Sequence, residues 1–143
     1  MRQIALAALV ALPTPAAAAS WLCVSEAATG FTLQGGEEYV AAPYKAGRNY
    51  LIRPARREDV QNLDNPDQYK FVAEILGDRT VAYFTEDIRE TGELYSNIAG
   101  SMVFHLSSRE QRFSMSMIYP YLLDREAEQY PPFMEIGRCS KID

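Results

Sequence analysis

Residues 101–119 read SMVFHLSSREQRFSMSMIY, and their alternating pattern indicates the fold class. Apolar side chains occupy every second position over residues 102–106 and again over residues 113–119. This period of two is typical of a β-strand with one buried face. The polar residues 107–111 separate the two runs, and their length is typical of a longer hairpin loop. The stretch therefore predicts an antiparallel β-hairpin.

The same alternation recurs before and after this hairpin. Residues 70–76 and 80–85 predict a second hairpin, with Gly77-Asp78 at the bend, where glycine supplies the positive φ that a tight turn needs. Residues 48–53 predict a strand that ends at Pro54, which cannot donate to a ladder. Further candidate strands cover residues 21–27, 30–33, 38–42 and 133–139, and short helices are predicted over residues 57–63, 85–89 and 124–129.

These elements predict a mostly β protein. We expect residues 20–143 to form a single antiparallel β-domain of about seven or eight strands, with one to three short helices. The strand density is typical of both a β-sandwich and a small β-barrel. The pattern leaves open which of the two closes the sheet.

The first nineteen residues have the features of a cleaved signal peptide. A positive start at Arg2 is followed by an apolar run over residues 4–12, a proline break, and small residues up to Ser20. The run is shorter than the roughly 20 apolar residues that span a bilayer, so we do not expect a membrane span in the mature chain. The sequence thus predicts a periplasmic or secreted protein.

The two cysteines, Cys23 and Cys139, lie near opposite ends of the predicted mature chain. In an oxidising compartment such a pair is more often a disulfide than two reactive thiols. We therefore expect a Cys23–Cys139 bond that joins the terminal strands.

The charge of the chain restricts its partners. The formal net charge is −5, and it becomes more negative if residues 1–19 are removed, because they contain the positive charge of Arg2. An acidic protein is repelled at long range by nucleic acid and by anionic membranes, so neither is an expected partner. The basic cluster Arg48, Arg53, Arg56 and Arg57 is offset by Glu58-Asp59 and is interpreted as a solvated strand end and loop.

No catalytic or metal-binding motif stands out. His105 is the single histidine, and no Gly-x-Ser-x-Gly elbow is present, so His105 is interpreted as structural. Residues 59–67 hold several Asp and Asn residues but lack the ligand order of a calcium loop. We predict no metal and no cofactor. Carboxylates that could form a hydrolytic pair are Glu37, Glu38, Glu86, Asp87, Glu90, Glu93, Asp124, Glu126 and Glu128.

Tyrosine is unusually frequent, with nine residues in the chain. Tyr119, Tyr121, Tyr130 and Phe133 flank a segment that also contains Pro120, Pro131 and Pro132. Aromatic and proline residues together can form a rigid contact surface, so these four aromatic residues are a candidate partner-binding loop. The alternative is ordinary packing of tyrosines at half-buried strand positions.

Several short sequence motifs follow one another along the chain: Cys23 before Gly30-Phe31, then Tyr50-Leu51-Ile52, Phe104 before Arg112-Phe113, residues 119–121, and residues 136–140. In this order they resemble small exported bacterial proteins of unassigned role. The resemblance covers most of the mature chain and implies a shared fold and a terminal disulfide. The cysteine and glycine spacing departs from that of the lysozyme-inhibitor β-barrels of the bacterial envelope.

Two functional hypotheses follow. The first is an exported, non-enzymatic β-domain that binds a protein, a glycan or a small apolar ligand. The second is a small envelope hydrolase that uses a carboxylate pair. Within the first class, a barrel with an apolar cavity would indicate a small ligand, whereas a filled interior would indicate a partner bound at the surface.

Overall fold

The computed structural model describes residues 19–35, 38–78, 80–98, 102–118 and 132–142 of the chain. These residues form nine strands, two four-residue helices and one 3-10 turn. In chain order the elements are β1 (Trp21–Gln34), β2 (Glu38–Tyr44), β3 (Asn49–Pro54), α1 (Arg57–Val60), η1 (Pro66–Gln68), β4 (Phe71–Ile75), β5 (Thr80–Phe84), α2 (Ile88–Thr91), β6 (Glu93–Ile98), β7 (Met102–Ser107), β8 (Arg112–Met117) and β9 (Phe133–Lys141).

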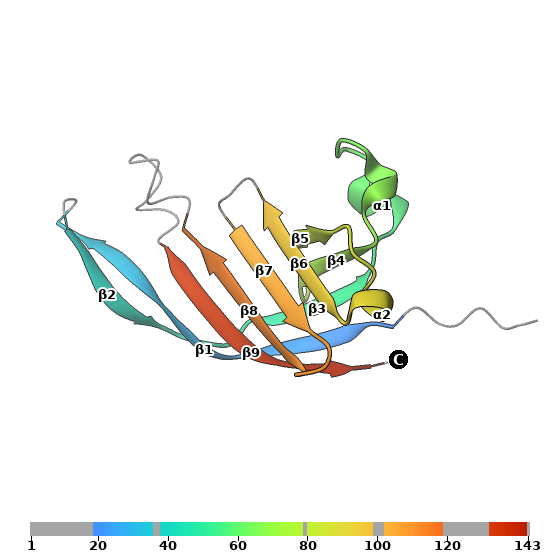
Figure 1. Ribbon diagram of the computed structural model, residues 1–143. Coiled ribbons are helices and arrows are strands. Elements are labelled where there is room, and N and C mark those ends of the chain that lie inside the picture. Colours follow the sequence, from blue (N-terminus) through green and yellow to red (C-terminus); the bar gives the residue numbers. More distant parts are fainter. Residues whose placement is uncertain (1–18, 36–37, 79, 99–101, 119–131, 143) are drawn as a thin grey trace, which may run out of the picture.

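The strands form one antiparallel sheet that curls into a nearly closed barrel (Figure 1). Their order is β5-β4-β3-β1-β9-β8-β7-β6, and β2 pairs with β1 beside this path. The end strands β5 and β6 are in contact, but no hydrogen-bonded ladder joins them among the described residues. Both predicted hairpins are confirmed, as β7–β8 and as β4–β5 with Gly77 at φ 82°.

Strand β1 is longer than the sequence predicted. Two separate strands were expected over residues 21–27 and 30–33, but one continuous strand runs through both. A register shift between Ser25 and Ala27 marks a bulge opposite β9, and such a bulge increases the local twist of a strand. Beyond the bulge β1 leaves β3 and pairs with β2, and Figure 1 shows this β1–β2 ribbon projecting to the left of the barrel.

Aromatic side chains fill the interior of the barrel. Tyr50 and Phe104 are fully buried, and their ring centroids lie 5.5 Å apart in an edge-to-face arrangement. The Phe113 ring lies 5.3 Å from that of Tyr50 and stacks on that of Phe104 at 5.5 Å. Rings at this spacing gain favourable quadrupole contacts in addition to their hydrophobic burial. Side chains thus occupy the space between the sheet walls at this level.

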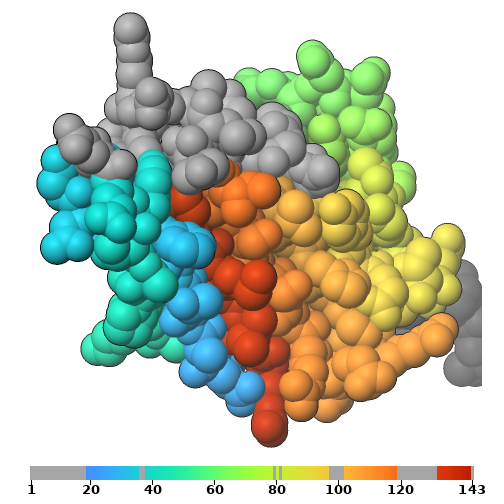
Figure 2. Space-filling model, turned by 60° about the vertical axis from the view of Figure 1, so that its left-hand side comes forward, coloured from blue at the N-terminus to red at the C-terminus, as the bar shows by residue number. Residues whose placement is uncertain are grey.

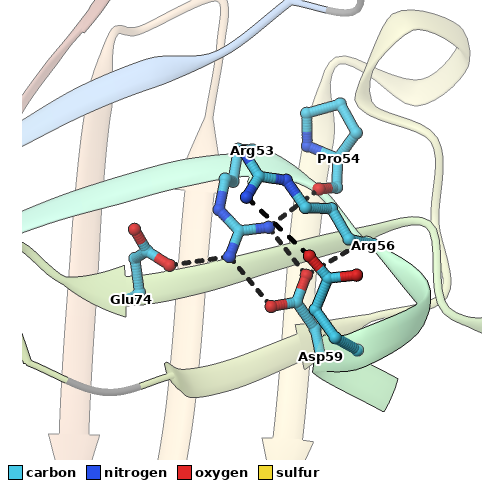
Figure 3. A network of polar contacts seen from close by, with 6 residues as sticks. Arg53, Pro54, Arg56, Asp59 and Glu74 are labelled. Carbon is cyan, nitrogen blue, oxygen red and sulfur yellow. Dashed lines mark hydrogen bonds and ion pairs between the residues drawn. The ribbon is translucent and has the colours of Figure 1, made fainter. Parts of the chain in front are cut away.

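The segment that carries α1 lies against the outer side of β3 and β4. Val60 of α1 is 6% exposed, and Val72, which alternates with the core residues Phe71 and Ala73, is fully buried. The Arg53 guanidinium binds Asp59 through two hydrogen bonds of 2.7 and 2.9 Å (Figure 3). Arg53 was interpreted as part of a solvated basic cluster, but its side chain is only 13% exposed.

Two further residues bind to the Arg53–Asp59 pair. Arg53 Nη2 lies 2.8 Å from Glu74 Oε2 of β4, and the Arg56 amide donates to Asp59 Oδ2 at 2.7 Å. The hydrogen bonds from Arg53 are the largest cause of a lowered Asp59 pKa, and burial of the carboxyl opposes them. Asp59 therefore remains ionised at neutral pH and holds α1 on the sheet.

Asp59→Asn is expected to lower the free energy of unfolding at pH 7 by about 2–3 kcal/mol, because Arg53 loses its ionised partner in a mostly buried site. A lowered pKa means that this stability is present above the ordinary Asp value of 3.8 and is lost as the pH falls through the folded value. Urea unfolding at pH 7 and below pH 3.8 should thus give a difference that shrinks with acidity.

Glu58→Gln is the control, because the Glu58 side chain is 68% exposed and lies 3.9 Å from Arg56. It should change the free energy of unfolding by less than about 0.5 kcal/mol. If the two variants were equally stable, the Arg53–Asp59 pair would not be what holds α1.

Candidate functional site

The inner face of β9 carries a buried carboxylate. Phe133, Glu135, Gly137 and Cys139 alternate along the strand on the core side, and Glu135 is 2% exposed. The hydroxyl of Tyr50, from β3 on the opposite side of β1, donates a hydrogen bond to Glu135 Oε2. A carboxylate removed from water is costly unless donors or a cation compensate it. Among the described residues, the barrel interior therefore contains a charged cluster within a core formed mainly by apolar side chains.

Arg48 supplies the positive charge of this cluster. Its Nη1 lies 3.6 Å from Glu135 Oε2, and its guanidinium lies 4.9 Å from the centroid of the Phe133 ring. A guanidinium over an aromatic face is attracted by the ring quadrupole. The Arg48 side chain is 48% exposed, so it joins the buried carboxylate to the surface of the domain.

Tyr50 acts in this cluster as a neutral donor. Burial of its hydroxyl, together with the hydrogen bond to Glu135 and the negative charge of that residue, raises the pKa of Tyr50 well above its usual 10.0. The phenol therefore stays protonated over the whole physiological pH range. This excludes Tyr50 as a base or nucleophile near neutral pH.

Tyr50→Phe is expected to lower the free energy of unfolding by about 2–3 kcal/mol at pH 7, because Glu135 stays buried but loses its donor. A raised pKa gives stability that is fully present below pH 10.0 and lost as the pH rises above it. Urea unfolding at pH 7 and above pH 10 should thus show the wild type losing stability faster than the variant.

Tyr95→Phe provides the matched control, since Tyr95 is 50% exposed on the outer side of β6. It should change stability by less than about 0.5 kcal/mol. The double variant Tyr50→Phe/Glu135→Gln should cost less than the sum of its two single changes, because the residues interact. Additive effects would contradict the direct coupling of these two side chains.

His105 belongs to a different cluster, on the outer face of β6 and β7. Its Nε2 lies 2.8 Å from Glu93 Oε2, and the Ser107 hydroxyl donates to the other oxygen of Glu93 at 2.8 Å. The serine is thus bonded to the acid and not to the imidazole, so the three residues lack the nucleophile–base contact of a catalytic triad. The side chains of His105 and Glu93 are 48% and 42% exposed. The arrangement is a cross-strand surface pairing.

A hydrolytic carboxylate pair needs one acid that holds a proton and a second that is ionised. Among the described residues, Arg53 brings two acids together, Asp59 and Glu74, because it binds both. The lowered pKa of Asp59 and the guanidinium between the acids do not suit that chemistry. Of the acids considered from the sequence, Glu37, Asp124, Glu126 and Glu128 lie outside the described residues.

Within the described ranges of the chain, no group of three or more His, Cys, Asp or Glu side chains could hold a metal ion. Within the same ranges no helix is long and apolar enough to cross a bilayer.

The predicted Cys23–Cys139 disulfide is confirmed. The two residues lie directly opposite one another on β1 and β9, with their Cα atoms 3.9 Å apart. Both are buried in the main core cluster. The bond therefore fastens the two terminal strands at the centre of the sheet.

The predicted partner-binding loop is described only in part. Tyr119, Tyr121 and Tyr130 lie outside the described residues. Phe133 lies in β9, where it is partly buried and packs against the core beneath Arg48. A role of these four residues in binding a partner stays a prediction.

Large apolar side chains are instead exposed on the outer face of the central strands. Figure 2 looks onto this side, where β2, β1, β9 and β8 lie next to one another. We call the following residues the outer apolar face: Val24 (45% exposed), Phe31 (48%), Ile118 (55%), Met134 (51%) and Ile136 (48%). At one end of this face Phe31, Tyr39, Ile118 and Pro132 line an open groove of about 430 Å³.

Comparisons with protein-family models, curated protein sequences and solved structures found no match for this chain.

Sequence reasoning missed the buried carboxylate, although a signal for it was present. Glu135 has the same strand phase as Phe133 and Cys139, so a strand over residues 133–139 that buries Cys139 must also bury Glu135. Tyr50 and Arg48 come from another strand and its preceding loop. Their approach to Glu135 follows from the closure of the sheet and had no local signal.

Proposed function

We propose that this protein is an exported, non-enzymatic β-domain that binds another protein through its outer apolar face. The observation that carries the proposal is the exposure of five large apolar side chains, four on the outer side of β1 and β9 and the fifth, Ile118, just after the end of β8. Isolated exposed apolar residues are ordinary, but a contiguous apolar patch on a protein surface often marks an interaction site.

The filled interior supports a surface-bound partner over a small ligand in a lumen. Barrels that carry small ligands hold them in a cavity between the sheet walls. Here Tyr50, Phe104 and Phe113 contact one another across that space. A cavity would indicate a small ligand, and a filled interior a partner at the surface. The aromatic packing therefore favours binding at the outer surface.

The lining of the groove supports a protein partner over a glycan. Sugar recognition needs hydrogen-bonding side chains around an aromatic platform, whereas the centre of a protein interface is formed by aromatic and aliphatic side chains. Phe31, Ile118 and Pro132 in the groove are apolar, and the nearby Met134 is also apolar. The predicted leader and the confirmed disulfide are both compatible with an oxidising compartment outside the cytoplasm.

Site-specific photo-crosslinking in the exporting cell tests the proposal. A photoreactive residue at position 134 should give one discrete crosslinked protein, whereas the same residue at Leu76 should not. Leu76 is a matched control because it is 54% exposed, close to the 51% of Met134, but lies in the β4–β5 turn.

A second variant makes the test specific. Ile136→Asp in the chain that carries the crosslinker should abolish the product, while an intact Cys23–Cys139 bond and an unchanged circular dichroism spectrum show that the domain still folds. Equal products at positions 134 and 76, or no product at either, would refute a partner on this face.

A further inference from the structure

We infer that the partner presents carboxylates beside apolar side chains, because the outer apolar face ends in two arginines. This inference rests on the proposed function and names the chemistry of the partner. Arg112 of β8 and Arg138 of β9 lie directly opposite one another in the sheet, and Val24 of β1 lies opposite Arg138 on the other side. All three side chains are exposed on the outer face.

Two like charges directly opposite one another on neighbouring strands destabilise a sheet. One of the two is partly compensated, since Arg138 Nε lies 3.0 Å from Glu26 Oε1. Arg112 forms no ion pair with any carboxylate in the part of the chain that the structure describes. Among the described residues the Arg112 guanidinium thus has no carboxylate partner, in a chain whose net charge is −5.

The spacing along β9 determines the shape of the complementary partner. Arg138, Ile136 and Met134 follow one another on the outer side of the strand. At a rise of about 3.3 Å per residue, the positive end lies roughly 13 Å from Met134. A short extended segment, or one side of a helix, covers this distance with an acid at one end and a large apolar side chain at the other.

Guanidinium groups suit this role because their planar donors match a carboxylate with two parallel hydrogen bonds. A carboxylate on the partner would also relieve the repulsion between Arg112 and Arg138. An anionic membrane would meet the negative charge of the rest of the domain, so the local arginine pair favours a protein with a limited acidic patch.

A random-peptide display library, selected on the oxidised full domain, tests the inference. The enriched peptides should contain Asp or Glu within a few positions of Leu, Phe, Trp or Met. Arg112→Glu should weaken their binding by about 10- to 100-fold, the effect expected for loss of a charge-assisted hydrogen bond and its charge. Arg57→Glu is the matched control, because Arg57 is an exposed arginine on α1, and it should leave binding unchanged.

The outcomes separate this inference from the proposed function. Peptides that lose binding with Met134→Asp but not with Arg112→Glu would refute the acidic partner and keep the apolar face. Enriched peptides that show no preference for Asp or Glu would likewise refute the acidic partner and keep the apolar face as the binding surface. Binding that neither variant weakens, or no enrichment at all, would refute both. Two other results would also refute a foreign acidic protein as the partner. One is binding of the domain to vesicles of anionic phospholipid but to no peptide. The other is dimerisation of the domain, observed by sedimentation and lost on substitution of Met134.

Discussion

Replacing Cys23 and Cys139 together with alanine is expected to lower the free energy of unfolding by about 4–5 kcal/mol. The two residues are 116 positions apart in the chain, so the bond restricts nearly the whole unfolded domain. In the chain-entropy model, stabilisation grows with the logarithm of the closed loop, and this loop is close to the longest that a domain of this size allows. The effect is a large fraction of the roughly 5–15 kcal/mol that stabilises a typical domain.

Urea unfolding of the double variant measures this effect, and reduced wild-type protein is its control. The m-value should rise for both, because an unfolded chain without the cross-link exposes more surface. The reduced wild type should retain slightly more stability than the variant, because its sulfur atoms still fill the buried sites. A loss below about 1 kcal/mol in both would contradict this expectation and show that the unfolded chain retains structure that restricts it even without the bond.

Gly137→Ala is the second large expected effect. A Cβ at this position would lie 2.0 Å from the carbonyl oxygen of Val24, 2.6 Å from Phe113 Cε1 and 2.9 Å from Ser25 Cα. Two of these atoms belong to the backbone of β1, which is held between β9 and β3 and cannot move without breaking the sheet. Overpacking of this kind typically costs about 1–3 kcal/mol, and more when the backbone must shift. We therefore expect Gly137→Ala to lower the free energy of unfolding by at least about 3 kcal/mol.

Thermal unfolding of oxidised protein tests this expectation. The midpoint should fall by roughly 10 °C or more for a domain of this size. Ser140→Ala is the matched control, since Ser140 is exposed on the same strand, and its midpoint should stay within about 2 °C of the wild type. If Gly137→Ala fails to accumulate as folded protein while Ser140→Ala does, the expectation also holds. A midpoint near that of the wild type would show that β1 can yield at the bulge.

Gly137 and the disulfide act on the same contact between β1 and β9. Gly137 allows the two strands to approach next to the bulge at Ser25, and Cys139 fastens them two residues later. The outer apolar face and its arginines lie on the other side of these strands. The contact that stabilises the fold therefore also supports the surface that we propose for binding.

Local signals predicted most of the strands. The β7–β8 hairpin was predicted because the alternation of buried and exposed side chains is complete within one stretch, and β3 ends at Pro54 as expected. Strand β6 was missed. Its inward residues include Ser96 beside Leu94, and a polar residue at a buried position weakens the apolar alternation. Helix α2 begins at Ile88, three residues after the start of the helix expected over residues 85–89, because Asp87 accepts from the Arg89 amide and caps it.

The β class, the two hairpins and the disulfide could be predicted from the amino-acid sequence, because each depends on residues within one stretch or on the count of two cysteines. The barrel in place of a sandwich, the burial of Glu135 beneath Arg48 and against Tyr50, and the position of Arg112 opposite Arg138 follow from the folded structure alone. Sheet closure and strand order bring together residues far apart in the chain, and no local pattern reports them. Alternation within a strand tells which residues share a face, but it does not tell which strand lies beside it.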